Sequence, residues 1–235
     1  MISLESVFRR AAPCPNRILV SVHIPKCGGI SFEHVLRRIF GDRRVWLNYG
    51  VVAGRSQARP ELIPPQARCI HGHFPSDTFD DIVPTPHLVT WLRHPVERVV
   101  SNYHHFLRHA DPANPCSAAL HGRDLSLEAF AELEGMRNEA SRYLAGKPLG
   151  AFDFVGITEK FEQSLRVFGA AFGFSVPASA PHENVNPGRR MECYPISDRV
   201  YEKILQLNLI DLQNYELAVA RLEGRPQFGA KPIAA

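Results

Sequence analysis

The sequence predicts a parallel three-layer α/β fold, in which helices cover both faces of a central sheet. Short apolar runs alternate with amphipathic segments along most of the chain. The apolar runs are continuous, as in strands that are buried on both faces. A glycine-rich loop joins the first apolar run to the first amphipathic segment, which is a strand–loop–helix connection.

Length and composition are those of one soluble globular domain. The chain has 235 residues, of which 45 % are apolar and 22 % are charged. We therefore expect a single domain over residues 1–235, with its core at about 17–222 and a frayed tail at 223–235.

The net charge limits the classes of binding partner, and cysteine usage indicates the cellular compartment. The formal net charge is only +3, so no nucleic-acid partner is expected. No run approaches the ~18 consecutive apolar residues of a membrane span, and residues 1–10 lack the apolar core of a secretory signal. The five cysteines form no Cys-x-x-Cys pair. We expect a cytoplasmic protein with reduced thiols, no membrane span and no structural zinc.

Hydrophobic periodicity predicts the N-terminal elements. Residues 18–24 are a mostly apolar, β-branched run typical of a buried parallel strand. Apolar residues then recur with helical spacing from Ser31 to Phe40, and Gly41 ends that helix. Residues 42–66 show weak periodicity and are expected to form a long loop.

Two further strands are predicted at residues 68–71 and 87–92. Arg93, His94 and Pro95 then precede a helix, because proline favours the first helical position. An apolar stripe on this helix faces the core. On a helical wheel, the opposite side carries Arg98, Ser101, His105 and Arg108.

The C-terminal half continues the alternation of strands and helices. Residues 110–125 are rich in Asp, Pro and Gly and predict a second long loop. The other expected elements are two short helices over 127–144 with a break near Gly135, a strand at 154–157, a helix over 161–172, an irregular segment over 176–195 and helical structure over 196–222.

The glycine-rich loop at residues 23–32 predicts an anion site. A helix N-terminus presents unpaired N–H groups and the positive end of the helix dipole. Glycines allow that backbone to close around a phosphate or sulfate. Lys26 adds a positive charge and Ser31 a hydroxyl. We therefore expect the loop to hold a phosphorylated nucleotide.

This loop is not the nucleotide-triphosphatase signature, because its lysine precedes the glycines instead of following them. The sequence also offers no convincing carboxylate at the end of a second strand to hold Mg²⁺. Both observations favour a metal-free anion loop. An ATP- and Mg²⁺-dependent P-loop phosphotransferase stays open as an alternative.

Four segments resemble the carbohydrate sulfotransferases. Residues 25–32, Pro-Lys-Cys-Gly-Gly-Ile-Ser-Phe, resemble their 5′-phosphosulfate loop, and residues 92–103 resemble their 3′-phosphate segment. Residues 70–74, Ile-His-Gly-His-Phe, resemble the uronosyl (heparan) 2-O-sulfotransferase branch, and residues 154–159 are similar to a later strand of that branch. The resemblance spans about residues 17–222. It implies the P-loop-like sulfotransferase fold, with a central parallel sheet flanked by helices.

The resemblance implies a reaction and a donor. Members transfer a sulfuryl group from 3′-phosphoadenosine 5′-phosphosulfate (PAPS) to a hydroxyl or amine without a metal. Lys26 would neutralise charge on the bridging oxygen as the S–O bond breaks. Arg93 and Ser101 would hold the 3′-phosphate, and a late basic loop would close over the nucleotide. The implied donor-binding set is Lys26, Cys27, Gly28, Gly29, Ile30, Ser31, Arg93, Ser101, Arg189 and Arg190.

Cys27 and Ile30 depart from the family pattern, which has threonines at these positions. Two hydroxyls that could contact phosphate are thereby lost. Backbone N–H groups and Ser31 can still hold the anion, so we expect weakened or rearranged donor binding. A degenerate family member that binds nucleotide without turnover is therefore a second alternative.

The acceptor hydroxyl needs a general base, and a neutral imidazole suits this at neutral pH. His73 is the first candidate by its match to the His-Gly-His motif. His71 is the second, as a base, as a substrate contact or as a residue that orients the site. Glu33 is a carboxylate alternative. The two histidines share one face of a strand, which could bind a metal, but no third ligand is evident.

The expected acceptor is a hydroxyl-bearing glycan, glycolipid or small molecule in a bacterial cytoplasm. His105 and Arg108 either contact this acceptor or form a solvated helix face. The loops that should shape the acceptor site carry no readable pattern.

Overall fold

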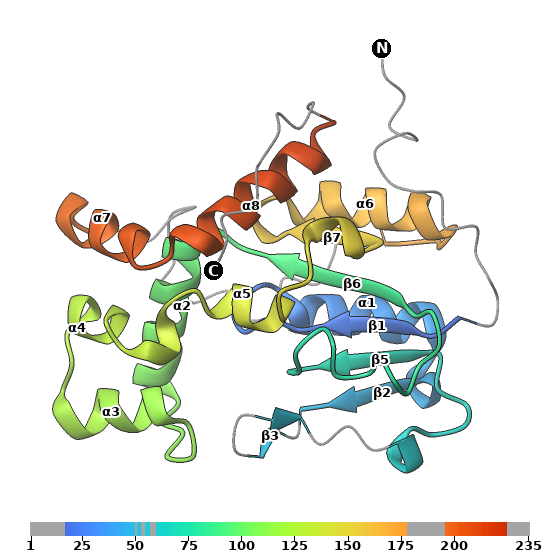
Figure 1. The fold of residues 1–235 in the computed structure, drawn as a ribbon, viewed down its shortest axis with the longest axis horizontal. Helices are drawn as coiled ribbons and strands as arrows, with labels where there is room; N and C mark the ends of the chain where they lie inside the picture. Colours follow the sequence, from blue (N-terminus) through green and yellow to red (C-terminus); the bar gives the residue numbers. More distant parts are fainter. Residues whose placement is uncertain (1–16, 50, 53–54, 57–59, 178–195, 225–235) are drawn as a thin grey trace.

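The computed structural model describes residues 17–49, 51–52, 55–56, 60–177 and 196–224. Its centre is a five-stranded parallel sheet with the order β2-β5-β1-β6-β7 (Figure 1). The strands are β1 (Leu19–Val22), β2 (Val45–Asn48), β5 (Cys69–Gly72), β6 (His87–Leu92) and β7 (Phe154–Ile157).

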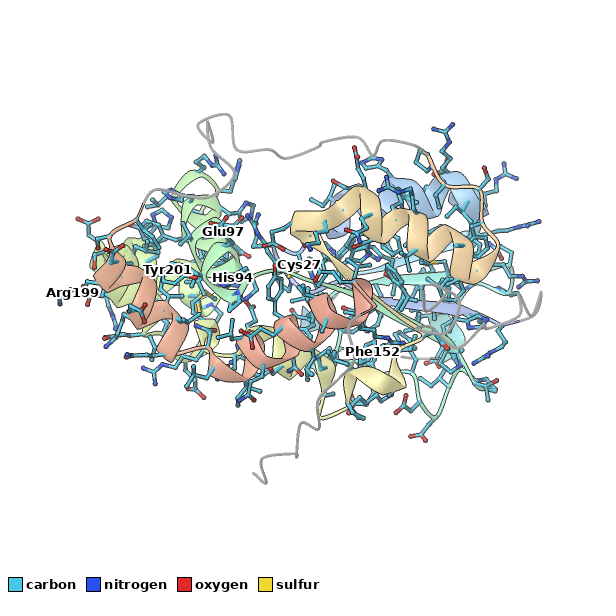
Figure 2. All side chains as sticks on the ribbon, turned by 90° about the horizontal axis from the view of Figure 1, so that it is seen from above. Cys27, His94, Glu97, Phe152, Arg199 and Tyr201 are labelled. Carbon is cyan, nitrogen blue, oxygen red and sulfur yellow. The ribbon has the colours of Figure 1, made fainter. Side chains whose placement is uncertain are left out.

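Helices cover both faces of this sheet (Figures 1 and 2). The helices α1 (Gly29–Phe40) and α6 (Phe161–Phe172) lie on one face, and α8 (Leu209–Leu222) lies on the other. Side chains such as Phe32 and Phe168 are completely buried between the layers. The predicted three-layer α/β fold is therefore confirmed.

A second group of helices lies beyond the carboxyl ends of the strands, where the arrows of Figure 1 point. It comprises α2 (Pro95–Arg108), α3 (Pro115–Arg123), α4 (Leu127–Ala131) and α7 (Asp198–Gln206). These helices enclose a small core of their own. In open α/β sheets, ligands bind outside the carboxyl ends of the strands, so this group borders the expected ligand site.

Several short elements complete the described chain. They are α5 (Glu139–Leu144), the antiparallel pair β3 (Val51–Val52) and β4 (Arg55–Ser56), and the 3₁₀ turns η2 (Asp42–Arg44), η3 (Pro60–Leu62), η4 (Glu134–Met136), η5 (Leu149–Ala151) and η6 (Thr158–Lys160).

The register of the sheet brings three loop residues side by side. Val22, the last residue of β1, pairs with Gly72, which in turn pairs with Asn48 at the end of β2. Neighbouring parallel strands lie about 4.8 Å apart. The next residue of each strand, namely His23, Tyr49 and His73, therefore emerges at one point of the sheet edge.

The four predicted strands and the helices α1, α2 and α6 are confirmed, although α1 begins at Gly29 and not at Ser31. Two expected loops are wrong in part. Residues 42–66 contain the edge strand β2, which is only four residues long and half-buried at its two middle positions. Residues 110–125 contain α3, whose cap Asn114 accepts hydrogen bonds from two backbone N–H groups.

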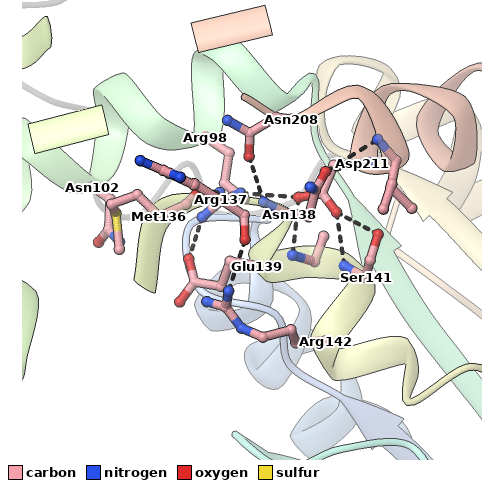
Figure 3. A network of polar contacts seen from close by, with 12 residues as sticks. Arg98, Asn102, Met136, Arg137, Asn138, Glu139, Ser141, Arg142, Asn208 and Asp211 are labelled. Atoms are coloured by element: carbon pink, nitrogen blue, oxygen red, sulfur yellow. Dashed lines mark hydrogen bonds and ion pairs between the residues drawn. The ribbon is translucent and has the colours of Figure 1, made fainter. Parts of the chain in front are cut away.

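The helical wheel places Arg98 on the polar side of its helix, but the structure places it in the interior. Its side chain is completely buried, because α5 and α8 cover this side of α2 (Figure 3). The guanidinium pairs with Glu139, donates to the Met136 carbonyl oxygen at 2.9 Å and lies 3.9 Å from an Asp211 carboxylate oxygen. Arg98 is thus a structural cation of the interior.

The residues around Arg98 also cap two helices reciprocally (Figure 3). Asp211 of α8 accepts the backbone N–H groups of Ala140 and Ser141 in α5, at 3.0 and 2.8 Å. Asn138, just before α5, accepts those of Ile210 and Asp211 at the start of α8, at 3.1 and 3.2 Å. Each helix thereby satisfies the free N–H groups of the other.

Substituting Arg98→Met is expected to destabilise the fold by about 3 kcal/mol, because Glu139 and Asp211 would lose a cation in a buried site. Urea unfolding would measure this loss. Arg199→Met is the matched control, since Arg199 makes an ion pair with Glu128 but its side chain is 82 % exposed. Equal midpoints for the two variants would contradict a stabilising role for the buried network.

Candidate active site

The loop before α1 has the geometry of an anion site. Lys26 and Gly28 both adopt left-handed backbone conformations, with φ of 66° and 78°. Glycine reaches this region without strain, whereas lysine seldom adopts it. Among the described residues no side chain caps the start of α1, and no acidic residue lies in its first turn. The first N–H groups of α1 therefore have no side-chain acceptor within the described part of the chain, and an anion could take that place.

The two atypical residues of this loop differ in burial and offer no hydroxyl to such an anion. The Cys27 side chain is completely buried in the main core, and burial raises its pKa to about 12. The Ile30 side chain is 43 % exposed. Neither side chain offers a hydroxyl, so the loop presents backbone N–H groups together with Lys26 and the half-buried Ser31.

Burial and two nearby guanidinium groups act on the Lys26 ammonium. Burial lowers its pKa to about 8, and the positive charges of Arg93 and then Arg108 contribute to this decrease. Arg93 also donates from Nη1 to the Lys26 carbonyl oxygen at 3.2 Å. The predicted 5′- and 3′-phosphate segments are therefore joined directly. In Figure 2, Cys27 marks the first segment, and His94 and Glu97 mark the second.

Carboxylates hold the other side of Arg93. Its Nη2 donates to Glu97 at 3.2 Å, and its Nε lies 3.9 Å from Glu159. Glu159 in turn accepts the backbone N–H of His94 at 2.9 Å. Ser101 is buried six residues after the first residue of α2, which is roughly 9 Å along the helix axis.

His73 has one ring nitrogen committed to the backbone. Its Nδ1 lies 2.6 Å from the carbonyl oxygen of His23. Because a carbonyl oxygen only accepts, Nδ1 must carry the proton, and Nε2 of the neutral ring is then the acceptor. Burial lowers the pKa of His73, and the Lys26 charge lowers it further. This is the protonation state that a general base requires.

His71 is less suited to meet a substrate. It is 1 % exposed, and its Nδ1 lies 2.9 Å from the Ser21 hydroxyl. Burial, followed by the proximity of His73, lowers its pKa to about 3. These observations favour an orienting role for His71 over the role of base.

The carboxylate alternative, Glu33, has both oxygens engaged. Oε1 pairs with Arg37 at 2.9 Å, and Oε2 accepts from the Tyr49 hydroxyl at 2.9 Å. A carboxylate held in this way is poorly placed to take a proton from an acceptor. His73 is the better candidate base.

Two site residues, His23 and Tyr49, were not predicted. His23 is 7 % exposed, and its ring lies 4.3 Å from that of His73, between centroids. Its Nδ1 lies 3.2 Å from the Tyr49 hydroxyl. The predicted first strand, residues 18–24, includes His23, whereas β1 ends at Val22 and leaves His23 in the loop; Tyr49 follows β2, a strand that periodicity does not reveal.

The remaining predicted residues fall into two sets. His105 and Arg108 lie in the last turns of α2, half-buried and exposed respectively. Burial, followed by the charge of Lys26, lowers the pKa of His105 to about 4, so this end of α2 lies within electrostatic reach of the loop. Arg189 and Arg190 lie outside the described residues.

The described part of the chain contains neither of two other kinds of site. None of its helices is both long and apolar enough to cross a membrane. Nor does it contain three or more His, Cys, Asp or Glu side chains grouped so that they could hold a metal ion.

Comparisons with known proteins identify the fold. No protein-family model and no curated protein matches the chain. A sulfotransferase from Alicyclobacillus acidocaldarius is 16 % identical, with 90 % of this chain and 97 % of that chain covered and a TM-score of 0.48. The mouse sulfotransferase SULT7A1 complexed with PAP is also 16 % identical, with 94 % and 92 % covered and a TM-score of 0.52. The chain thus shares its fold with that mouse sulfotransferase.

Proposed function

We propose that this protein is a PAPS-dependent sulfotransferase. One observation carries the proposal: Lys26 and the start of α1, which no described side chain caps, can together hold an anion, and Lys26 lies close enough to lower the pKa of His73, an imidazole whose Nε2 is an acceptor. Leaving-group stabilisation and proton removal thus belong to one site. The shared fold with a sulfotransferase that was solved with PAP supports the same donor.

The proposed donor-binding residues fit a molecule with two anionic ends. The backbone of residues 27–31 and the Lys26 ammonium would hold the 5′-phosphosulfate, since both offer donors to negative oxygens. The planar Arg93 guanidinium and the Ser101 hydroxyl would hold the 3′-phosphate. Arg93 would then exchange part of its contact with Glu97 for the phosphate.

The donor supplies the sulfuryl group, and the chain's own residues position it and move one proton. Nε2 of His73 would accept the proton of the acceptor hydroxyl as the new S–O bond forms. Lys26 would stabilise the negative charge that develops on the phosphate oxygen as the old S–O bond breaks. Catalysis would then rest on positioning and electrostatics, as in phosphoryl transfer.

The acceptor in this proposal is the hydroxyl of a glycan, glycolipid or small molecule. The His71-Gly72-His73 segment supports the uronosyl 2-O-sulfotransferase-like branch, and the structural neighbours give that branch no further support. His105 and Arg108 would contact the acceptor from α2, where they lie near Lys26.

A thermal-shift comparison tests the donor. We expect 3′-phosphoadenosine 5′-phosphate (PAP) to raise the melting temperature by several degrees, because a ligand that binds only the native state at 100 times its Kd adds about 2.7 kcal/mol. ADP lacks the 3′-phosphate and should stabilise less. ATP with Mg²⁺ should add nothing beyond ADP.

Stabilisation by ATP with Mg²⁺ alone would contradict the proposal and favour the phosphotransferase alternative. Stabilisation by PAP without transfer of labelled sulfate to any member of a glycan panel would favour the degenerate nucleotide-binding alternative. Transfer to a glycan hydroxyl would establish the activity and identify the acceptor class.

A further inference from the structure

The described residues contain a cluster of three imidazoles and one phenol at the carboxyl ends of β1, β2 and β5. The ring of His23 stacks on His71 with a centroid distance of 5.0 Å and an interplanar angle of 16°, and lies 4.3 Å from His73. Tyr49 meets all three rings edge-on, at 5.0 Å from His73, 5.7 Å from His23 and 6.1 Å from His71. His23 and Tyr49 each contact the other three rings of the cluster.

The hydrogen bonds of this cluster have only one consistent direction. The Glu33 carboxylate can only accept, so Tyr49 donates its hydroxyl proton to Glu33 at 2.9 Å. The Tyr49 oxygen then accepts from Nδ1 of His23 at 3.2 Å. The chain Glu33–Tyr49–His23 therefore holds His23 as the neutral Nδ1–H tautomer. Arg37, paired with Glu33 at 2.9 Å, anchors its outer end.

The opposite edge of the His23 ring touches the anion loop. A methyl group on Gly29, the first residue of α1, would lie 1.9 Å from Cδ2 and 2.0 Å from Nε2 of His23. Real carbon atoms do not approach so closely, so only glycine leaves room for this ring. His23 is thus in contact with the start of α1 on one edge and bonded to Tyr49 on the other.

His23 also supports the proposed base in two ways. Its backbone carbonyl oxygen fixes the tautomer of His73 at 2.6 Å, and its ring forms one wall of the space that His73 occupies. A displacement of His23 would therefore move His73 relative to the loop. Misplacement of a reacting group by about 1 Å can cost roughly 10²-fold in rate.

We propose that His23, oriented by the Glu33–Tyr49 hydrogen bonds, is a positioning residue that sets the proposed base His73 against the anion loop. This inference rests on the proposed function, because it assigns a role within the same site. Its structural part, namely the orientation of the His23 ring by Tyr49, can be tested without any activity.

The variant Tyr49→Phe removes only the hydroxyl that links Glu33 to His23. We expect kcat to fall by about tenfold, with the KM for PAPS changed by less than about twofold, since the anion loop keeps Lys26. Long-range ¹H–¹⁵N NMR of the unliganded protein should show His23 with its proton on Nδ1 in the wild type. In Tyr49→Phe, we expect the Nε2–H form to become populated.

Tyr103→Phe is the matched control, because it also removes a single phenol hydroxyl. That hydroxyl donates to the Leu125 carbonyl oxygen at 3.2 Å, beside the small core of the second group of helices. This control should leave kcat and the His23 spectrum unchanged. An unchanged His23 tautomer in Tyr49→Phe would overturn the inference, and so would an unchanged kcat. A wild type that transfers no sulfuryl group, but whose His23 spectrum responds to Tyr49→Phe, would contradict the proposed function while supporting the hydrogen-bonded chain.

Discussion

Replacement of Lys26 by alanine is expected to lower kcat for sulfuryl transfer by about 10²- to 10³-fold. The loss of one preorganised charge at a developing anion typically has an effect of this size. Lys26 is suited to this role because its backbone is held in a left-handed conformation and its carbonyl oxygen is bound by Arg93. The measurement is single-turnover transfer from labelled PAPS to an acceptor identified with the glycan panel.

The same substitution should also change how PAP binding depends on pH. The ammonium form of Lys26 binds the anion, and its pKa in the free protein is lowered to about 8. Binding to the wild type should therefore be strong at pH 7 and weaken as the pH rises through about 8, where the lysine loses its proton. In Lys26→Ala, the affinity should be about tenfold weaker at pH 7 and should lack this decrease.

The matched control is Lys203→Ala. Lys203 lies on α7, in the second group of helices, and makes an ion pair with Glu132. Calorimetric titration with PAP at several pH values would compare the three proteins. If Lys26→Ala kept the alkaline weakening of the wild type, another group would be responsible for it, and Lys26 would not be the anion-binding cation.

The sheet and its flanking helices could be predicted from the sequence because their signals are local. Strands such as β6 and β7 are continuous apolar runs between turn residues, and burial on both faces produces that pattern. The helix α6 shows a clear apolar face and ends at Gly173 in a left-handed conformation. Each of these elements has the predicted boundaries.

The prediction failed where burial depends on distant parts of the chain. Arg98 lies on the side of α2 that looks polar on a helical wheel. Its charge is nevertheless neutralised in the interior by Glu139 and Asp211, which are more than 40 residues away in the sequence. Nothing in the local sequence signals that partnership. The amino-acid composition of residues 110–125 also gave a wrong prediction. It indicates a loop, whereas Asn114 and Pro115 mark the start of the helix α3.

The candidate site could be predicted in part, because the signals of some of its residues are also local in the sequence. His73 and Arg93 directly follow strands, Lys26 comes a few residues after the first strand, and the ends of neighbouring parallel strands meet at one edge of a sheet. Tyr49 has the same relation to β2. That edge strand has only two buried residues, so its periodicity is too weak to indicate a strand, and the tyrosine could not be placed.

Substituting His73→Asn is expected to lower kcat by at least about 10²-fold, the usual contribution of a general base. Asparagine keeps an N–H donor that can reach the His23 carbonyl oxygen, which accepts from His73 at 2.6 Å in the wild type. It has no basic nitrogen in place of Nε2. The variant therefore separates proton removal from the structural hydrogen bond, and its melting temperature should stay close to that of the wild type.

The pH profile gives a second, independent readout for His73. Only the neutral imidazole can act as a base, and its pKa is lowered from the ordinary value, mainly by burial. The kcat of the wild type should therefore hold as the pH falls to about 6.5 and decline only in more acidic solution. The residual activity of His73→Asn should lack that acidic decline.

His121→Asn is the matched control, because His121 also bonds through a ring nitrogen to a backbone carbonyl oxygen, that of Phe106 at 2.8 Å, but lies on α3. It should keep both the kcat and the acidic decline of the wild type. An acidic decline that persists in His73→Asn would assign proton removal to another residue. Glu33 is held by Arg37 and Tyr49, and His71 is only 1 % exposed against 7 % for His23, so His23 would then be the next imidazole of the cluster to test.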